Sequence, residues 1–261
     1  VPAPACKHGG ILVRTLFSAI SPGTELMKIS ESKMSLIGKA RARPDQVKKV
    51  LATLAQQGPL ATYEKVMQRL DSLTPLGYSL CGEVEEVGAG VTEFKVGDRV
   101  ACAGNAHALH ADLNWVPVNL AVPATDGVQP AHAAFATIGS IALQGIRQAL
   151  IQPGELVCVV GLGLIGQILI RMLKSIGARP VGVELAEQRC ALALAGGAEL
   201  VHNPNQEDVK DFIERIRALS DGQGCDHIII SAGGTSNPAI ELGPIIGRNR
   251  ARVTVIAETS L

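Results

Sequence analysis

The stretch Val157–Ile170, VCVVGLGLIGQILI, decides the fold of this sequence. Its apolar start is typical of a buried strand and its end of a helix, and glycines spaced G-x-G-x-x-G stand between them. In such a loop the first glycine permits a tight turn, the second lets a pyrophosphate approach the backbone, and the third lets helix and strand pack closely. The positive end of the helix then faces the anion. We expect dinucleotide binding by Gly161, Leu162, Gly163, Leu164, Ile165 and Gly166.

An acidic residue follows this loop at the spacing that dinucleotide-binding domains use. The next strand-like run, RPVGVEL, ends at Glu184, and an acidic residue about 20 positions after the glycines can accept hydrogen bonds from a ribose diol. A carboxylate there also repels a 2′-phosphate, so NAD is favoured over NADP. Arg189 argues the other way, because a nearby arginine can tolerate that phosphate. The alternative is a structural glycine turn in an α/β domain that binds no cofactor.

The rest of the second half repeats this alternation of strand and helix. Beyond about residue 122, apolar runs such as CDHIIISAG alternate with helical stretches such as AEQRCALALAGG and EDVKDFIERIRALS. Continuous apolar strands separated by helices indicate an α/β fold whose parallel sheet is covered on both faces. We predict a doubly wound Rossmann domain over residues 123–261, incomplete at its C-terminal end.

The first half, residues 1–122, has the pattern of antiparallel β structure with a helical insertion. Strand-like runs such as GEVEEVGAGV and DRVACAG are bounded by glycine turns. Over about residues 33–72 the pattern is helical, with Pro44 at the start of the first helix and Gly58-Pro59 closing it. Apolar residues recur at helical spacing in Val47, Val50, Leu51 and Leu54, and again in Tyr63, Val66, Met67 and Leu70. We therefore predict two amphipathic helices that form an αα-hairpin.

Composition narrows the class of partner. Basic and acidic residues balance at 24 each and aromatics make up only 3%, which argues against nucleic acid as a partner. No apolar run reaches the roughly 18 residues of a membrane-spanning helix, so we expect no membrane association. The six cysteines contain no C-x-x-C pair, which favours reduced thiols and a cytoplasmic protein.

Four stretches of the sequence carry a resemblance to a known family: GYSLCG with Gly88 and Val91, FKVGDRVA, GLGLIG and SAGGTSNPAIELG. On these motifs the chain resembles the medium-chain dehydrogenase/reductase family over nearly its whole length. The resemblance implies a GroES-like catalytic domain beside the Rossmann domain, both truncated here, in an oxidoreductase of small molecules. ISPGTE, the helical insertion and PLGYS resemble the zinc-independent subgroup that is fused in bacteria to a Gfo/Idh/MocA-type domain. That subgroup accompanies sugar biosynthesis, and the chain reads as a fragment of such a protein.

The resemblance also shows where a catalytic zinc would be held. Its three ligand positions fall at Ser21, at Tyr78 and near Ile138, none of which is a cysteine, histidine or carboxylate. We therefore expect no metal site. His107 and His110 stand three apart, but no acidic or thiolate partner lies at a suitable spacing, and we expect them at the surface or at strand ends.

Without zinc, hydrogen-bond donors must stabilise the developing alkoxide or enolate. Tyr78, in a vacated ligand position, is the candidate donor, since a phenol stays protonated near neutral pH and can act as an acid. Thr24 lies near the family's proton-relay hydroxyl, and Glu25 takes the place of the adjacent acidic residue. The alternatives are a packed tyrosine at Tyr78 and turn chemistry after Pro22-Gly23 for the other two.

We therefore expect an NAD-dependent, zinc-independent oxidoreductase that acts on the carbonyl or alcohol group of a small polar substrate, such as a sugar derivative. The alternatives are an NADPH-dependent quinone or enoyl reductase and a non-catalytic dinucleotide-binding module of a larger protein. A homodimer is left open, because the sixth strand through which the family often dimerises is missing. A basic run could attract an anionic substrate or form a solvated helix face; it consists of Lys33, Lys39, Arg41, Arg43, Lys48 and Lys49.

Overall fold

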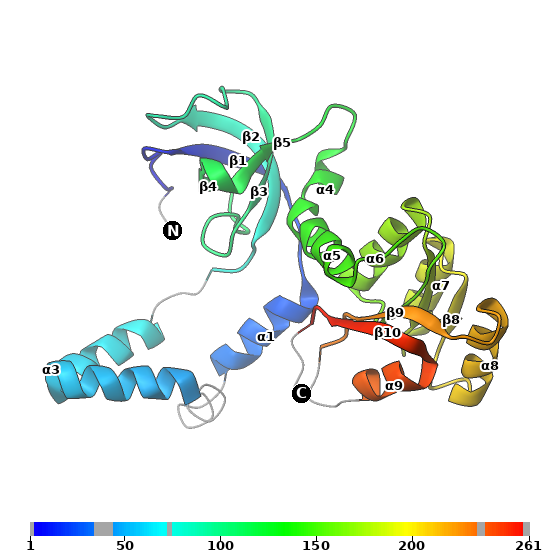
Figure 1. Cartoon of the computed structure of the whole chain (residues 1–261). Helices are drawn as coiled ribbons and strands as arrows, with labels where there is room; N and C mark the ends of the chain where they lie inside the picture. The colour runs from blue at the N-terminus through cyan, green and yellow to red at the C-terminus, as the bar shows by residue number, and fades with distance from the viewer. Residues whose placement is uncertain (1–2, 34–43, 72–74, 234–237, 258–261) are drawn as a thin grey trace. The chain divides into compact units, whose positions relative to one another are not determined.

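The computed structural model describes residues 3–33, 44–71, 75–233 and 238–257 (Figure 1). The chain divides into two compact units, Val1–Phe135 and Ala136–Leu261. The boundary suggested by the sequence, after residue 122, falls within the last strand of the first unit. The short helix α4 (Pro130–Ala133) follows that strand and packs on the first unit's sheet, so it belongs to that unit.

The first unit is built on an antiparallel sheet of five strands in the order β4-β1-β2-β3-β5. The strands are β1 (Gly10–Ser18), β2 (Ser79–Val87), β3 (Arg99–Ala103), β4 (Leu113–Pro117) and β5 (Ala121–Pro123), with a 3₁₀ turn, η1 (Val118–Leu120), before the last. Apolar side chains from these strands form one buried core that includes Ile11, Leu80 and Val116. The predicted GroES-like antiparallel β domain is thus confirmed.

Two longer helices belong to the same unit. Helix α1 (Pro22–Lys33) begins where the alternative interpretation of Thr24 and Glu25 placed a turn after Pro22-Gly23. That alternative was wrong, because proline suits the first turn of a helix: its fixed φ is already helical and its missing N–H has no intrahelical acceptor there. The predicted insertion is helix α3 (Pro44–Asp71), which breaks at Gly58 (φ 80°, ψ 172°) into two helical parts, as Figure 1 shows.

Three residues of the apolar face predicted for the insertion are exposed in this structure. Val50, Leu51 and Leu54 remain 38%, 58% and 41% exposed, whereas Val47 and Met67 are partly buried. The spacing therefore identified the helix correctly, but it did not predict that these three side chains face solvent. Among the residues that the structure describes, no helix is long and apolar enough to cross a membrane.

The second unit contains a parallel sheet in the order β10-β9-β6-β7-β8. Its strands are β6 (Leu156–Val160), β7 (Arg179–Val183), β8 (Leu200–His202), β9 (Cys225–Ile230) and β10 (Gly247–Val255). The strand order reverses direction between β6 and β9. In open α/β sheets a crevice for ligands opens at the carboxyl ends of the strands at such a switch point.

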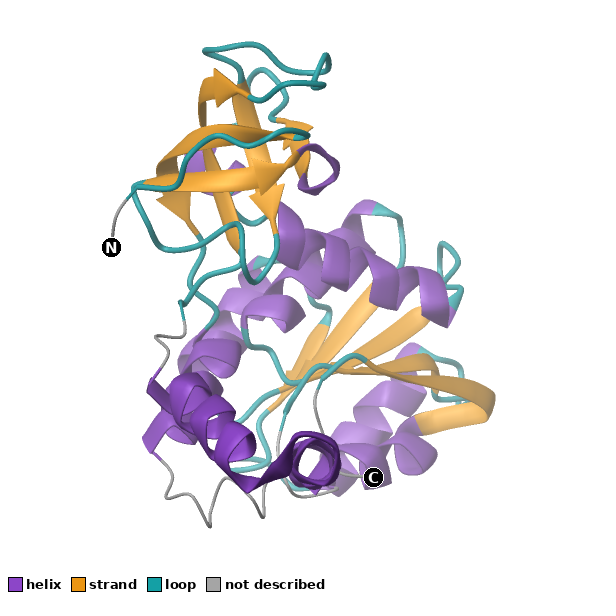
Figure 2. Cartoon of the chain, turned by 90° about the vertical axis from the view of Figure 1, so that its left-hand side faces the viewer, coloured by secondary structure: helices purple, strands orange, loops and turns teal. Residues whose placement is uncertain are grey.

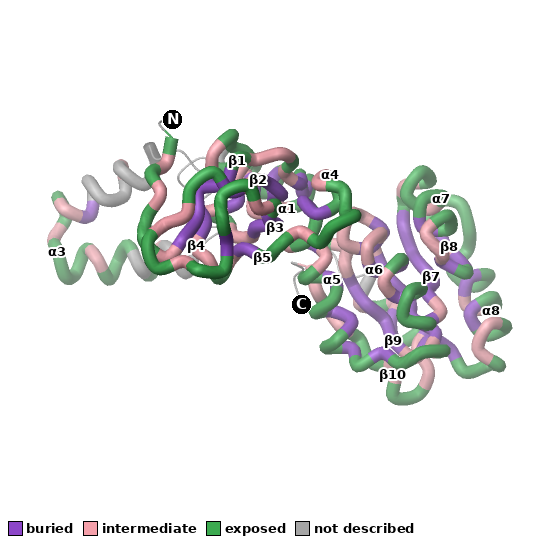
Figure 3. The backbone as a smooth tube through the Cα atoms, turned by 90° about the horizontal axis from the view of Figure 1, so that it is seen from above, coloured by how far each residue is buried: buried purple, intermediate pink, exposed green. Residues whose placement is uncertain are grey.

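Helices cover both faces of this sheet, as Figure 2 shows. They are α5 (Ala136–Ala149), α6 (Leu164–Ser175), α7 (Glu187–Ala195), α8 (Val209–Leu219) and α9 (Pro238–Ile246). Val157 and Val159 pack in one core with α5 and α6, whereas Cys158 and Val160 pack in another with Phe212 of α8. The strands are therefore buried on both sides: all five residues of β6, four of the five of β7 and five of the six of β9 are buried, and Figure 3 shows buried segments at β7 and β9. The predicted doubly wound Rossmann sheet is confirmed.

Candidate functional site

The glycine loop follows β6 at the switch point of the second unit. Gly161 has φ +90°, and a Cβ atom placed on it would lie 2.6–2.8 Å from atoms of Ala232. Its amide donates to the carbonyl of Val183 at 2.8 Å, which ties the loop to the end of β7. Only glycine tolerates both the positive φ and this close approach. The first glycine thus makes the tight turn that the sequence predicts.

The other two glycines differ sharply in their surroundings. A Cβ on Gly166 would lie 2.1 Å from the carbonyl oxygen of Gly161, so this glycine is needed for close packing of helix against loop. A Cβ on Gly163 would meet nothing within 4 Å. Packing therefore does not explain Gly163, whereas open space above the backbone is what a pyrophosphate requires.

The helix that follows presents an uncapped N-terminus beside that space. Gly163 is the N-cap of α6, and no side chain caps this end. The first N–H groups of a helix have no intrahelical acceptor and carry partial positive charge, so they suit an anion. The loop residues predicted to bind the cofactor all lie in this turn, which therefore fits the diphosphate of a dinucleotide.

Glu184 lies directly after β7, and its side chain reaches the glycine loop. One carboxylate oxygen, Oε2, accepts from the amide of Leu162 at 2.8 Å, and Oε1 accepts from the amides of Leu185 and Ala186 at 3.0 Å each. The residue is only 9% exposed. A carboxylate has about four lone-pair sites, so at least one remains on Oε2 for a ribose hydroxyl. Sequence spacing predicted this position but not its bond to the loop.

Arg189 lies beside the same carboxylate. Its Nη1 is 3.7 Å from Glu184 Oε1, and its side chain is 55% exposed. Because the distance is long and the arginine is largely in solvent, this ion pair contributes little to stability. The structure thus places side by side Glu184, which favours NAD, and Arg189, which could tolerate the 2′-phosphate of NADP.

The predicted catalytic residues of the first unit converge at one end of its sheet. The amide of Ala19, just after β1, donates to the carbonyl of Ser79 at 2.9 Å, and the carbonyl of Tyr78 accepts from Gly104 at 3.0 Å. Tyr78 is half-buried, and its hydroxyl has no hydrogen-bond partner within the described ranges of the chain. It is therefore free to donate to a ligand.

Thr24 and Glu25 reach this end of the sheet from the first turn of α1. Thr24 Oγ1 accepts from Ser21 Oγ at 3.4 Å. The carboxylate of Glu25 is buried, accepts from the amide of Ser21 at 3.3 Å, and lies 2.9 Å from Nε2 of His110. The expectation that His110 has no acidic partner was wrong, because fold rather than sequence spacing brings Glu25 to it across 85 positions. The ring of His107 packs edge-on against the ring of Trp115, which is a structural contact.

The residues present do not fit a catalytic zinc. Ser21 and Tyr78 offer hydroxyls and Ile138 offers nothing, whereas zinc prefers thiolate, imidazole and carboxylate ligands. No group of three or more His, Cys, Asp or Glu side chains that could hold a metal occurs within residues 3–33, 44–71, 75–233 and 238–257. The donor chemistry of these positions thus differs from that of a zinc site.

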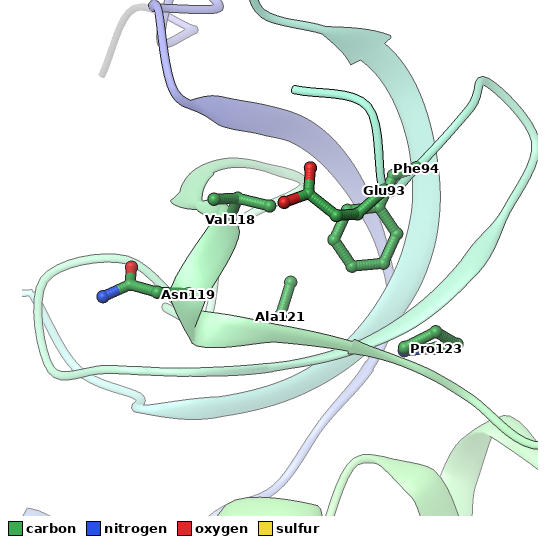
Figure 4. Close-up of a pocket in the computed structure, with 6 residues that line it drawn as sticks. All are labelled: Glu93, Phe94, Val118, Asn119, Ala121 and Pro123. Atoms are coloured by element: carbon green, nitrogen blue, oxygen red, sulfur yellow. The ribbon is translucent and has the colours of Figure 1, made fainter. Parts of the chain in front are cut away.

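The predicted basic run is described only in part. Lys33 ends α1 and is exposed, and Lys48 is exposed on α3. Lys39, Arg41 and Arg43 lie outside the described residues, as does the side chain of Lys49. A separate hollow of about 340 Å³ in the first unit contains none of the predicted site residues (Figure 4). It is lined by Glu93, Phe94, Val118, Asn119, Ala121 and Pro123.

Comparison with known proteins gives matches in both units. A family model described as "Alcohol dehydrogenase GroES-like domain" matches residues 57–138, and one described as "Zinc-binding dehydrogenase" matches residues 165–257. The D-guloside 3-dehydrogenase of Escherichia coli (strain K12) is 35% identical over 159 residues, which are 60% of this chain and 44% of that protein. The chain thus spans less than half the length of this relative.

Two further matches bear on function and fold. A quinone oxidoreductase of Pseudomonas aeruginosa is 30% identical over 161 residues, 60% of this chain and 49% of that protein. The solved structure of the alcohol dehydrogenase TADH from Thermus sp. ATN1 covers 100% of this chain and 74% of its own, with a TM-score of 0.75 at 22% identity. The last match shows a shared fold.

Proposed function

We propose that this chain, whose residues 57–138 and 165–257 match models of the alcohol dehydrogenase-like, medium-chain dehydrogenase/reductase family, transfers a hydride between NAD(H) and a small polar, sugar-derived substrate without zinc. The observation that carries the proposal is the open space at Gly163 beside the uncapped N-terminus of α6. Glu184, with a carboxylate lone pair left for a ribose hydroxyl, supports the choice of NAD.

NAD, when bound, supplies the hydride acceptor, and the protein must orient the reacting carbon and manage a proton. In the proposal, the amides of the Gly163–Gly166 turn hold the diphosphate. Glu184 holds the adenosine ribose and repels a 2′-phosphate. The Tyr78 hydroxyl donates a hydrogen bond to the substrate oxygen, whose negative charge grows during the reaction. Thr24, whose hydroxyl is paired with Ser21, provides a further hydroxyl at that end of the sheet.

Zinc independence is supported by the donor set and not by the fold. In enzymes that catalyse this kind of reaction with a bound metal, the metal acts as a Lewis acid and polarises the substrate oxygen. At the corresponding positions this chain offers Ser21, Tyr78 and Ile138, and only the hydroxyls can interact with that oxygen. A hydrogen bond from Tyr78 is therefore the proposed replacement.

The substrate class is supported by one relative. The E. coli protein that is 35% identical over 159 residues is named for oxidation at position 3 of a D-guloside, a secondary alcohol on a sugar ring. A secondary alcohol of a glycoside accordingly becomes the proposed substrate.

A cytoplasmic location, supported by six free cysteines, belongs to the same proposal, as do a fused Gfo/Idh/MocA-type domain and a homodimer.

An NADPH-dependent quinone or enoyl reductase is the second candidate, favoured by the quinone oxidoreductase of P. aeruginosa at 30% identity over 161 residues. The buried carboxylate of Glu184 argues against it, because a 2′-phosphate would meet a negative charge. Rates with NADH and a quinone, with NADPH and a quinone, and with NAD and a glycoside distinguish the two candidates directly.

The test follows NADH formation from NAD and methyl D-guloside after exhaustive treatment of the chain with a chelator. We expect turnover to survive the chelator. Tyr78→Phe should lower kcat about 10²-fold, the effect of removing one oxyanion donor, while NADH affinity stays within about twofold of wild type. A kcat equal to that of wild type in this variant would show that the Tyr78 hydroxyl has no role in the reaction. If the chelator removed a metal and turnover were lost as a result, zinc independence would be refuted.

A further inference from the structure

A hydroxyl, an imidazole and a carboxylate are joined in series at the end of the first unit's sheet. Nδ1 of His110 lies 2.8 Å from Ser18 Oγ, and Nε2 lies 2.9 Å from Glu25 Oε1. The three residues come from the end of β1, the first turn of α1 and the loop between β3 and β4. The Glu25 side chain is 9% exposed and that of His110 24%, so the series runs from a buried carboxylate outward.

The hydrogen-bond pattern fixes a direction for proton transfer. Glu25, when ionised, can only accept, so Nε2 of a neutral His110 carries the hydrogen and donates it to Oε1. Nδ1 is then the acceptor for the hydroxyl of Ser18. An imidazole held in one tautomer by a carboxylate, with its free nitrogen on a hydroxyl, is arranged to take up the proton of that hydroxyl.

Among the contacts of the described residues, the other histidines lack this arrangement. Two of them also pair with a glutamate. His202 pairs with Glu207 and stacks on Phe212. His227 pairs with Glu155, but its Nδ1 is buried without a hydrogen-bond partner. Within that part of the chain, only His110 combines a carboxylate on one ring nitrogen with a hydroxyl on the other. Packing alone therefore does not explain the contacts of both ring nitrogens of His110.

The series also lies beside the chain segment that leads into Tyr78. The amide of His110 donates to the carbonyl of Leu76 at 3.0 Å, and a Cβ on Gly77 would lie 2.7 Å from that same amide nitrogen. Gly77 has φ +97°, a conformation that favours glycine and lets residues 76–78 run against the His110 loop. Ser18 neighbours the same segment, since it pairs with Leu80 across β1 and β2.

We propose that Ser18 and His110 form the proton relay of the hydride-transfer reaction, with Glu25 as the positioning residue for His110. During oxidation the substrate O–H gives its proton to Ser18 Oγ, and the Ser18 hydroxyl proton passes to His110 Nδ1. The C–H hydride goes to NAD, so the alcohol becomes a ketone, NAD becomes NADH, and the proton resides on the imidazole. Its partial exposure allows release to water. The relay rests on the proposed function and supplies the base that Tyr78, a donor, does not provide.

The test compares Ser18→Ala, His110→Gln and, as a matched control from the same loop, His107→Gln in the full chain. NADH binding is measured by fluorescence, and turnover with NAD and methyl D-guloside. General acid–base catalysis contributes about 10²–10⁴-fold, so we expect both relay variants to lose about 10²-fold or more in kcat with unchanged NADH affinity. The control should retain kcat within about twofold. Because Ser18→Ala leaves the His110–Glu25 pair intact, it reports on the relay even where His110→Gln unfolds the loop.

A second readout is independent of turnover. Nitrogen NMR of His110 should show the Nε2–H tautomer in wild type and lose that preference in Glu25→Gln. A Nδ1–H tautomer in wild type overturns the relay whatever the enzyme does. Wild-type kcat in Ser18→Ala and His110→Gln, with turnover present, overturns the relay and leaves the proposed function intact. Absence of both NADH binding and turnover in wild type instead contradicts the proposed function, and the relay with it.

Discussion

The strongest test of the glycine loop compares two substitutions of the same kind, Gly163→Ala and Gly166→Ala. Each adds one methyl group, but a Cβ at Gly163 meets nothing within 4 Å, whereas one at Gly166 lies 2.1 Å from a backbone oxygen. If Gly163 exists for the ligand and Gly166 for the fold, the first change should harm binding and the second stability.

The expected magnitudes differ enough to be measured. Alanine is a poorer N-cap than glycine, so Gly163→Ala should cost at most about 1 kcal/mol of unfolding free energy. At Gly166 the clash with the fixed carbonyl of Gly161 should cost about 3 kcal/mol or more. That outweighs the gain of about 1 kcal/mol from the higher helix propensity of alanine. The net loss is thus about 2 kcal/mol, and at about 2–4 °C per kcal/mol the melting temperature of Gly166→Ala should fall by about 4–8 °C.

Thermal unfolding followed by circular dichroism measures the stability, and fluorescence titration with NADH measures the binding. We expect Gly163→Ala to melt within a few degrees of wild type and to bind NADH at least about tenfold more weakly, a loss of about 1.4 kcal/mol. The reasoning fails if Gly163→Ala binds NADH as tightly as wild type. It fails equally if the two variants unfold at the same temperature.

Three other predictions follow from individual contacts. Glu184→Gln removes the charge that opposes a 2′-phosphate and releases Arg189, so the NADPH-to-NADH affinity ratio should rise about tenfold, or about 1.4 kcal/mol; an unchanged ratio in paired titrations removes Glu184 from cofactor choice. Ser79→Ala removes a buried 2.5 Å hydrogen bond to the carbonyl of Ala134 and should cost about 1–3 kcal/mol in urea unfolding. The control Ser140→Ala, which removes an exposed bond within α5, should stay within about 0.5 kcal/mol, and equal costs would contradict the assigned burial. Burial raises the pKa of Cys102 to about 12 from its ordinary 9.0, so the native thiol should resist alkylation at about pH 8, and mass spectrometry should find it modified only after unfolding. Because the unfolded chain ionises this thiol first, its contribution to stability should be lost as pH rises from 9.0 towards about 12.

Local motifs explain what the sequence could predict. The glycine loop, the strands beside it and the position of Glu184 all lie within one strand–helix–strand unit, where spacing along the chain determines spacing in space. The antiparallel strands of the first unit were likewise recognisable from alternation and turns. Both sheets therefore followed from sequence patterns whose physical cause is local.

What the sequence could not predict depends on contacts between distant segments. Glu25 and His110 meet only because helix α1, which follows β1, and the loop before β4 lie at the same end of the sheet, and no periodic pattern records that. Helix α1 was concealed by Pro22-Gly23, which punctuates turns and helix starts alike. In α3, periodicity identified a helix, but it did not predict that Leu51 remains 58% exposed.

The most direct test of the central claim is a fluorescence titration of the chelator-treated chain with NADH and, separately, with NADPH. The account predicts saturable binding of NADH and at least about tenfold weaker binding of NADPH, since a 2′-phosphate would face the carboxylate of Glu184. Equal or tighter binding of NADPH would contradict the role given to Glu184. Binding of neither nucleotide would contradict the assignment of the glycine loop as a dinucleotide site.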